Sequence, residues 1–299
     1  MEQMVKNFIR FLKKQRNLKE NTILSYQRDI DAFLEFARKN GQTEMQAICM
    51  EFDNYLEDLH AKKRSRSTVS RNIASLRCLF RYMTANKLLE ADPSKGKKYE
   101  TGTESAREYQ DLLTIEEIDR LINAAKTEDV KGYRDTAMLE TLYATGLKVT
   151  DFLNIRLSDL HLKEGYLTVE TDGHTRYVPL YKGATKAIRA YLNQGRKYLE
   201  ASPKTDVLFL NLNGQPFSRQ GLWKFLKTYG QKAGIQKELT PQLFRRSMAV
   251  HLAENGADVT VLQELLGHKN IALTKQYIKG FKPKIISDYK KYHPRSQQS

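Results

Sequence analysis

The chain has 299 residues, which suggests two domains, and its 40% hydrophobic and 28% charged residues exclude a disordered chain. Lys and Arg number 50 against 35 Asp and Glu, so the net charge of +15 favours polyanionic partners such as nucleic acid. The sequence contains no apolar run of about 18 residues and no signal-peptide pattern near its start. We therefore expect a cytoplasmic protein with no membrane partner.

Metal and disulfide chemistry are also not expected. The two cysteines, Cys49 and Cys78, lie in partly apolar helical segments, which predicts two buried free thiols. The six histidines are scattered, and no Cys/His cluster has the spacing of metal ligands. The sequence therefore predicts no metal and no cofactor.

Residues 1–89 are predicted to form a helical bundle. Apolar residues recur at helical spacing in four segments, and the last runs from Val69 through Phe80 to Met83, with Ser67 as a candidate N-cap. Between residues 60 and 98 there are eleven basic residues and two acidic ones, so this segment alone contributes +9. A face that is merely solvated usually mixes both signs, and we therefore favour contact with DNA over a role in solubility. The residues assigned to DNA are Lys62, Lys63, Arg64, Arg66, Arg71, Arg77 and Arg81.

Residues 90–110 lack apolar periodicity and contain several helix breakers, which predicts a linker between two domains. A second domain over residues 111–299 then begins with a capping box from Thr114 to Glu117. Helices are expected to about Phe152, and strands over 166–169 and 176–180 with Asp172-Gly173 between them predict a hairpin. Helical patterns follow at 184–199, 219–233, 241–255 and 259–266. The predicted fold is mainly α, in two domains, with a small antiparallel sheet.

Several short motifs of the second domain occur in a specific order. The segment 144–151 reads ATGLKVTD, and 239–247 reads LTPQLFRRS. NGAD follows at 255–258, LLGH at 265–268 and TKQY at 274–277, and the chain nears its end with YHPR at 292–295. In this order the motifs resemble the conserved boxes of the tyrosine recombinases, especially the bacterial Xer group. The N-terminal helical segment also fits the DNA-clamping domain of that family, so the resemblance covers essentially the whole chain.

The resemblance implies a particular chemistry. Tyrosine recombinases attack a DNA phosphodiester with a tyrosine hydroxyl and form a 3′-phosphotyrosyl link without ATP or metal. A tyrosine with a pKa of about 10 must be activated, charge on the phosphoryl oxygens must be neutralised, and the leaving oxygen must be protonated. The family uses two arginines, a hairpin lysine, two histidines and the tyrosine for these tasks.

Three of those six positions match in this chain. Arg245 corresponds to the second arginine, a phosphate clamp, and His268 to the second histidine, a hydrogen-bond donor to the phosphate. Tyr277 corresponds to the nucleophile.

The other three positions do not match. Lys148 replaces the first arginine and loses its planar fork, and Gln242 replaces the first histidine and cannot carry a proton. Thr171 replaces the hairpin lysine and is no acid at neutral pH. The hairpin register leaves His174 or Arg176 as a substitute, and His174 is the better one because it titrates near neutrality.

Two functional hypotheses follow. In the first, which we favour, the chain is a DNA-binding protein on a recombinase scaffold with lost or weakened strand cleavage, acting as a repressor in transcription regulation or as an accessory factor. In the second, it is an active, divergent site-specific recombinase or integrase. The resemblance also implies a two-domain clamp around double-stranded DNA. A C-terminal helix within residues 283–292 would join protomers into a homo-oligomer on DNA. In the accessory role, another recombinase would be a further partner.

Overall fold

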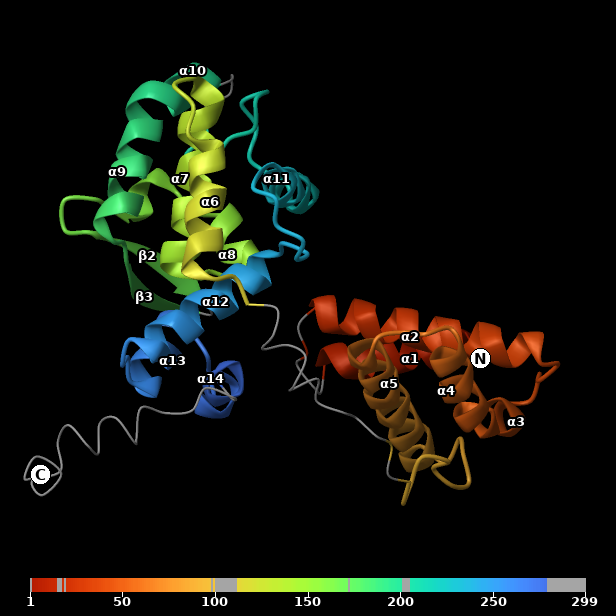
Figure 1. Cartoon of the computed structure of the whole chain (residues 1–299). Coiled ribbons are helices and arrows are strands. Elements are labelled where there is room, and N and C mark those ends of the chain that lie inside the picture. The colour runs from red at the N-terminus through yellow and green to blue at the C-terminus, as the bar shows by residue number, and fades with distance from the viewer. Residues whose placement is uncertain are drawn as a thin grey trace, which may run out of the picture. The chain divides into compact units, whose positions relative to one another are not determined.

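The computed structural model describes residues 2–14, 18, 20–97, 99, 112–171, 173–200 and 205–278. It divides into two compact units, residues 1–104 and 105–299. The expected C-terminal helix within residues 283–292 lies outside the described residues. Figure 1 shows the helices and strands of both units.

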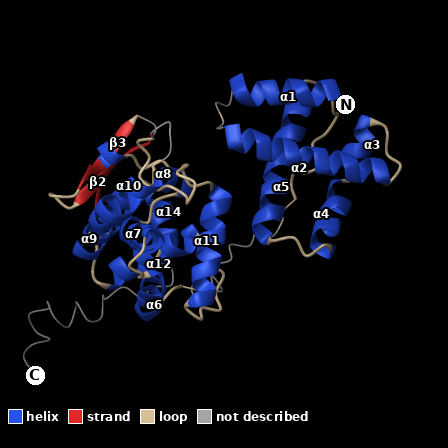
Figure 2. Ribbon diagram, turned by 90° about the horizontal axis from the view of Figure 1, so that it is seen from above, coloured by secondary structure: helices blue, strands red, loops and turns tan. Residues whose placement is uncertain are grey.

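The first unit is helical throughout (Figure 2). Its helices are α1 (Glu2–Lys14), α2 (Glu20–Lys39), α3 (Met45–Met50), α4 (Phe52–Ala61) and α5 (Arg66–Ala85). Phenylalanine rings from different helices meet in its core, where Phe80 packs edge-on against Phe33 and Phe52 at centroid distances of 6.1 and 5.2 Å. The apolar residues of the predicted stripe on α5 are buried, as its periodicity indicates.

Two details of the first unit differ from the prediction. The N-cap of α5 is Ser65 rather than Ser67, because the Ser65 hydroxyl accepts a hydrogen bond from the Thr68 amide at 3.2 Å. Ser67 lies inside the first turn of the helix. Cys49 is buried as expected, whereas Cys78 is only partly buried, since it lies at the edge of the apolar stripe of α5.

The second unit is mainly helical, and its small sheet lies at one edge of the helices (Figure 2). It contains α6 (Ile115–Ala125), α7 (Val130–Thr145), α8 (Val149–Leu153), α9 (Lys182–Tyr191), α10 (Lys197–Leu199), α11 (Arg219–Lys232), α12 (Pro241–Glu254), α13 (Val259–Leu266) and α14 (Ile271–Tyr277). The expected capping box is present, since the Thr114 hydroxyl accepts from the Glu117 amide and the Glu117 carboxylate accepts from the Thr114 amide. The long helix expected over 184–199 is interrupted by a π-helical turn, Leu192–Arg196.

The predicted hairpin is present, with longer strands than expected. Strand β2 (Tyr166–Thr171) pairs antiparallel with β3 (His174–Pro179), and Thr171 lies opposite His174. Gly173 has φ of +78°, a conformation that glycine adopts without steric cost, while Asp172 lies outside the described residues. A third strand, β1 (Leu160–His161), pairs with β2 and was not predicted, because two residues are too few to show alternation.

Candidate active site

Among the motif positions that the structure describes, Arg245 is the most buried charged residue. Its side chain is on α12 and the residue is 1% exposed. Its Nη1 donates to the carbonyl of Gly146, which follows α7, and its Nη2 donates to the carbonyl of Leu266, the last residue of α13, both at 2.6 Å. A single guanidinium therefore joins the ends of two helices to a third helix.

His268 is bonded directly to Arg245. Arg245 Nη2 and His268 Nε2 are 3.0 Å apart, and because a guanidinium only donates, Nε2 is the acceptor. His268 Nδ1 lies 2.9 Å from the Thr274 hydroxyl and therefore carries the ring proton. Burial lowers the pKa of His268 to about 4, helped by the charges of Arg245, Lys148 and Arg176. The ring is thus neutral at pH 7 with its proton on Nδ1, so donation from Nε2 to a phosphate requires a proton on Nε2 as well as loss of the contact with Arg245.

Tyr277 is the last residue of α14, and its side chain lies outside the described residues. A tight turn between α13 and α14 precedes the short helix that ends at Tyr277. Gly267 ends α13 in the left-handed conformation, and the Asn270 side chain caps α14 by accepting from the Ala272 amide. Thr274, which bonds His268, is on the same short helix as Tyr277.

The three substituted positions lie on separate elements. Lys148 precedes α8 and is exposed, and its charge acts on His268. Gln242 is exposed in the first turn of α12, three residues before Arg245. Thr171 ends β2, and its hydroxyl is buried without a hydrogen-bond partner among the described residues, whereas His174 opposite it is exposed.

Two further residues belong to this region. Arg176 on β3 donates through Nη1 to the Leu265 carbonyl and pairs through Nη2 with Asp151 at 3.2 Å. The sequence showed Arg176 only as one substitute for the missing lysine, and Asp151 only as part of a motif. No local pattern indicates that Arg176 and Asp151 form an ion pair, because they are 25 residues apart in the sequence.

The basic residues of the first unit are in two kinds of environment. Lys63, Arg64 and Arg66 are exposed where α4 gives way to α5. Arg71 instead binds the Asp29 carboxylate with two hydrogen bonds, of 2.9 and 2.7 Å. The remaining members also make contacts within the unit: Lys62 with Asp58, Arg77 with the Lys97 carbonyl and the Tyr99 ring, and Arg81 with the Arg77 carbonyl.

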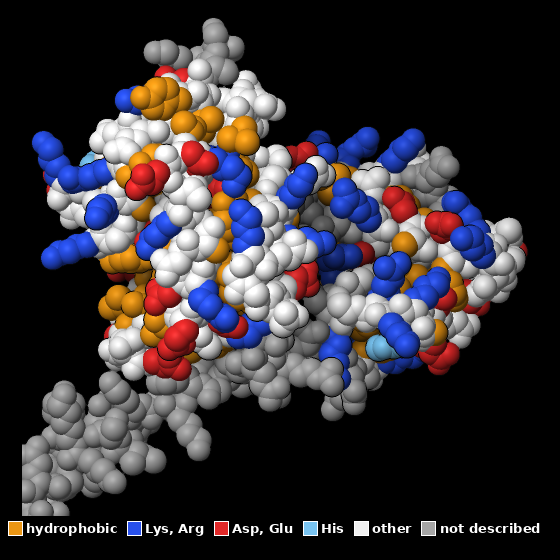
Figure 3. Space-filling view, turned by 45° about the horizontal axis from the view of Figure 1, so that its top comes forward, with side chains coloured by type: hydrophobic (Ala, Val, Ile, Leu, Met, Phe, Trp, Pro, Cys, Tyr) orange, Lys and Arg blue, Asp and Glu red, His pale blue; other side chains and the backbone are white. Residues whose placement is uncertain are grey.

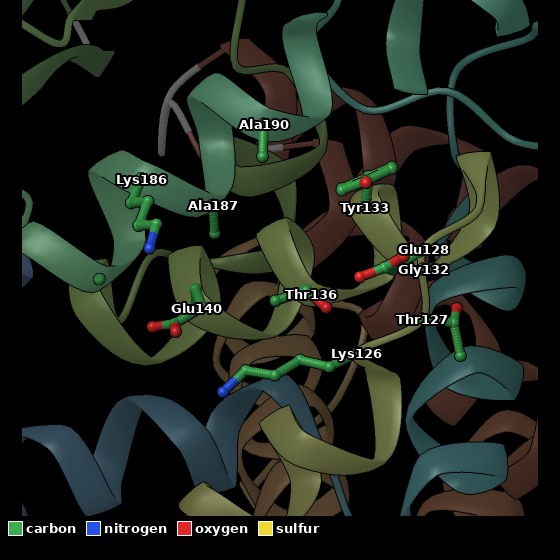
Figure 4. A pocket seen from close by; sticks show the side chains of 11 residues that line it. Lys126, Thr127, Glu128, Gly132, Tyr133, Thr136, Glu140, Lys186, Ala187 and Ala190 are labelled. Carbon is green, nitrogen blue, oxygen red and sulfur yellow. The ribbon is translucent and has the colours of Figure 1, made fainter. Parts of the chain in front are cut away.

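Lys and Arg side chains are spread over the visible face of each unit, with Asp and Glu side chains between them (Figure 3). A hollow of about 610 Å³ lies between the region of α6 and α7 and helix α9, and is lined by residues such as Lys126, Glu140 and Lys186 (Figure 4). None of the motif residues lines it.

Within the described ranges no group of three His, Cys, Asp or Glu side chains could hold a metal ion, and no helix there is long and apolar enough to cross a bilayer.

Comparison with known proteins identifies the family. Residues 111–282 match the phage integrase family, and residues 5–87 match the N-terminal SAM-like domain of phage integrases. The chain is 35% identical to tyrosine recombinase XerD of Listeria monocytogenes serotype 4b over 300 residues, covering 99% of this chain and 100% of that protein. It is also 35% identical to XerD of Halalkalibacterium halodurans over 295 residues, 98% of each protein.

Solved structures give the same fold. A lambda integrase dimer bound to a COC′ core site matches with a TM-score of 0.72 at 18% identity, covering 94% of this chain and 96% of that one. XerH bound to palindromic difH substrate matches with a TM-score of 0.72 at 19% identity, covering 96% and 84%. The chain therefore belongs to the phage integrase family, with the two-domain, mainly helical fold of tyrosine recombinases. Within that family it is a Xer-like tyrosine recombinase.

Proposed function

We propose that this protein binds a specific site in double-stranded DNA through its tyrosine recombinase scaffold and cleaves that site weakly or not at all. The observation that carries the proposal is that only part of the catalytic set implied by the resemblance is present. Arg245 and His268 form one hydrogen-bonded unit, whereas Lys148, Thr171 and Gln242 stand where the resemblance requires an arginine, a lysine and a histidine. Relatives in this fold, lambda integrase and XerH, are described bound to DNA.

Each substitution removes a different part of the chemistry. Lys148 keeps its charge but cannot grip two phosphoryl oxygens at once. Gln242 cannot transfer a proton, and the Thr171 hydroxyl is both too weak an acid and buried. One lost donor lowers the rate by about 10²–10³-fold and one lost acid or base by about 10²–10⁴-fold. Because such losses are not additive, we expect a combined loss of at least ~10⁴-fold.

DNA affinity does not depend on these three side chains to the same degree. It is summed over many contacts of Lys and Arg with phosphates, so three substitutions remove a small part of it. The exposed Lys63, Arg64 and Arg66 favour such contacts in the first unit. Closure of both units around the duplex, and oligomers formed through residues 283–292, belong to the same proposal.

A divergent but active recombinase is the second candidate. The observation that favours it is the intact local framework around Arg245, His268 and the helix that ends at Tyr277. Its curated relatives are also named tyrosine recombinases. The two candidates differ in one measurable event, the covalent joining of Tyr277 to DNA.

The test begins by selecting a bound site from a random-sequence duplex library. A nicked duplex that contains this site is incubated with the protein, and covalent adducts are sought on a denaturing gel. We expect a band shift on a native gel. We also expect adduct formation at least ~10⁴-fold slower than in a variant that restores the three substituted catalytic residues. An adduct that forms readily in the native sequence and disappears in Tyr277→Phe would establish the active recombinase instead.

A restored variant tests whether the three substitutions cause the loss of cleavage. The triple change Lys148→Arg, Thr171→Lys and Gln242→His returns the three groups that the resemblance requires. We expect this variant to form an adduct that depends on Tyr277, at nearly unchanged DNA affinity. Failure of the restored variant to gain any adduct while it still binds DNA would show that the three substitutions are not the cause of the inactivity.

A further inference from the structure

Arg176 is a largely buried cation whose contacts give it a role other than that of a substitute for the hairpin lysine. It lies on β3 opposite Val169, and its side chain is 11% exposed. Its Nη1 donates to the carbonyl of Leu265, two residues before Gly267, and its Nη2 pairs with Asp151, whose side chain is 13% exposed. The residue therefore connects the hairpin both to α13 and to the segment that follows Lys148.

The glycine of the LLGH motif is packed against this guanidinium. A Cβ atom at Gly267 would lie 3.1 Å from both Cζ and Nε of Arg176, closer than ordinary van der Waals contact. Gly267 also has φ of +62°, a conformation in which a side chain is strained. Both constraints act on the residue directly before His268, so the position of Arg176 and the shape of this turn depend on each other.

The environment of Arg176 is electrostatically costly. Its Nε is buried and has no hydrogen-bond partner among the described residues. Burial lowers the pKa of Arg176, the neighbouring Arg245 lowers it further, and the Asp151 carboxylate opposes both. The positive charges of Arg245, Lys148 and Arg176 all lower the pKa of His268, and an anion entering the site would offset this excess of positive charge.

We propose that Arg176 is a positioning residue of the phosphate site, which holds the Gly267–His268 turn against the hairpin and adds a third positive charge beside Arg245 and Lys148. The proposal deepens the DNA-binding function proposed above and rests on it for the identity of the anion, a DNA phosphate. Arg176 acts through His268 and the turn. It also fixes the hairpin end, where Thr171 and His174 lie, relative to that turn.

The test measures His268 in the free, full-length protein. The pKa of its imidazole is followed by NMR, with His268→Asn used to identify the signal. Exchange of the His268 amide, which donates to the Gln263 carbonyl at 3.1 Å, reports on the turn. The variants are Arg176→Gln, which removes the charge, and Arg176→Lys, which keeps the charge but cannot bridge Leu265 and Asp151. Arg189→Gln is the matched control, because Arg189 also donates to a backbone carbonyl, that of Leu162, and is exposed.

We expect the pKa of His268 to rise in Arg176→Gln and to move less in Arg176→Lys, since only the first removes a neighbouring positive charge. Amide exchange should accelerate in both variants, and affinity for the selected duplex should fall roughly tenfold in Arg176→Gln. Arg189→Gln should leave all three unchanged. If Arg176→Gln does not fold, the exchange rate in Arg176→Lys decides.

An unchanged His268 amide in Arg176→Lys, or an unchanged pKa in a folded Arg176→Gln, overturns the proposal. The outcome is separate from that of the proposed function. A native protein that binds no duplex at all removes the DNA-binding function, while the pKa and exchange measurements still decide whether Arg176 positions His268.

Discussion

Arg71 illustrates how the partner of a side chain determines its role. The sequence assigns Arg71 to a DNA-binding flank, yet its guanidinium is bound to the Asp29 carboxylate, which is 4% exposed and also accepts from the Ser75 hydroxyl. The hydrogen bonds to Asp29 raise the pKa of Arg71. A buried carboxylate without its partner is costly, so this arginine stabilises the first unit whether or not it also meets DNA.

We therefore expect Arg71→Ala to lower the free energy of unfolding by about 2–3 kcal/mol, below the range for a fully buried pair because the Arg71 side chain is half exposed. Urea unfolding measures this change. Arg66→Ala on the same helix is the control and should change stability by no more than about 0.5 kcal/mol. Equal, small effects of the two variants would show that Asp29 does not need Arg71.

At the scale of elements, the site is built where helices end. Helix α7 ends before Gly146, which adopts φ of +52°, and the Gly146 carbonyl accepts from Arg245. Helix α13 ends at Leu266, whose carbonyl also accepts from Arg245. Carbonyls at helix C-termini lack partners within their own helices, so a buried guanidinium satisfies them and fixes both ends at once.

Gly146→Ala tests this arrangement. A Cβ at this position would lie 2.1 Å from Met248 Cε, and the positive φ adds backbone strain, so we expect a loss of about 1–3 kcal/mol together with weaker DNA binding. Gly256→Ala is the matched control, because Gly256 has φ of +90° and a Cβ there would have no neighbouring atom within 4 Å. Thermal unfolding and duplex affinity of the two variants are compared. If they lose equal stability and keep equal affinity, backbone strain alone explains the effect.

For the whole molecule, the net positive charge is the property from which we predict the salt dependence of DNA binding. The chain has a net charge of +15, and Lys63, Arg64 and Arg66 are exposed in its first unit. Arg71 is also partly exposed, although it pairs with Asp29. The exposed charges are the ones that can release counterions from DNA phosphates. Affinity for duplex DNA should therefore depend steeply on salt.

We expect affinity for the selected duplex to fall by about 10³–10⁵-fold between 50 and 200 mM salt, the range for roughly 6–10 phosphate contacts. Arg66→Ala should make the slope of log affinity against log salt shallower by about 0.9. Lys39→Ala should leave the slope unchanged, because Lys39 lies outside the basic segment and pairs with Glu35. Fluorescence anisotropy at several salt concentrations gives these slopes, and an equal slope for the two variants would argue against the basic segment as the DNA-binding surface.

Local patterns in the sequence were enough to predict most of the helices, the capping box at Thr114 and the hairpin that contains Gly173. These features depend on residues a few positions apart, so periodicity and cap chemistry reveal them. The two-residue strand β1 and the π-helical turn were missed, because each is too short to impose a period of its own. The order of the motifs also indicated the family, which the comparisons confirmed.

Only the tertiary structure decided which charged side chains are held by which partners. Arg71 and Asp29 are 42 residues apart, Arg176 and the Leu265 carbonyl 89, and Arg245 and the Gly146 carbonyl 99. Pairings over such separations depend on how helices and strands pack, and no local pattern encodes them. For this reason the sequence by itself determined the scaffold and the residue types at its site, whereas the fold decided that Arg71 pairs with Asp29 and that Arg245 and Arg176 hold the turn that carries His268.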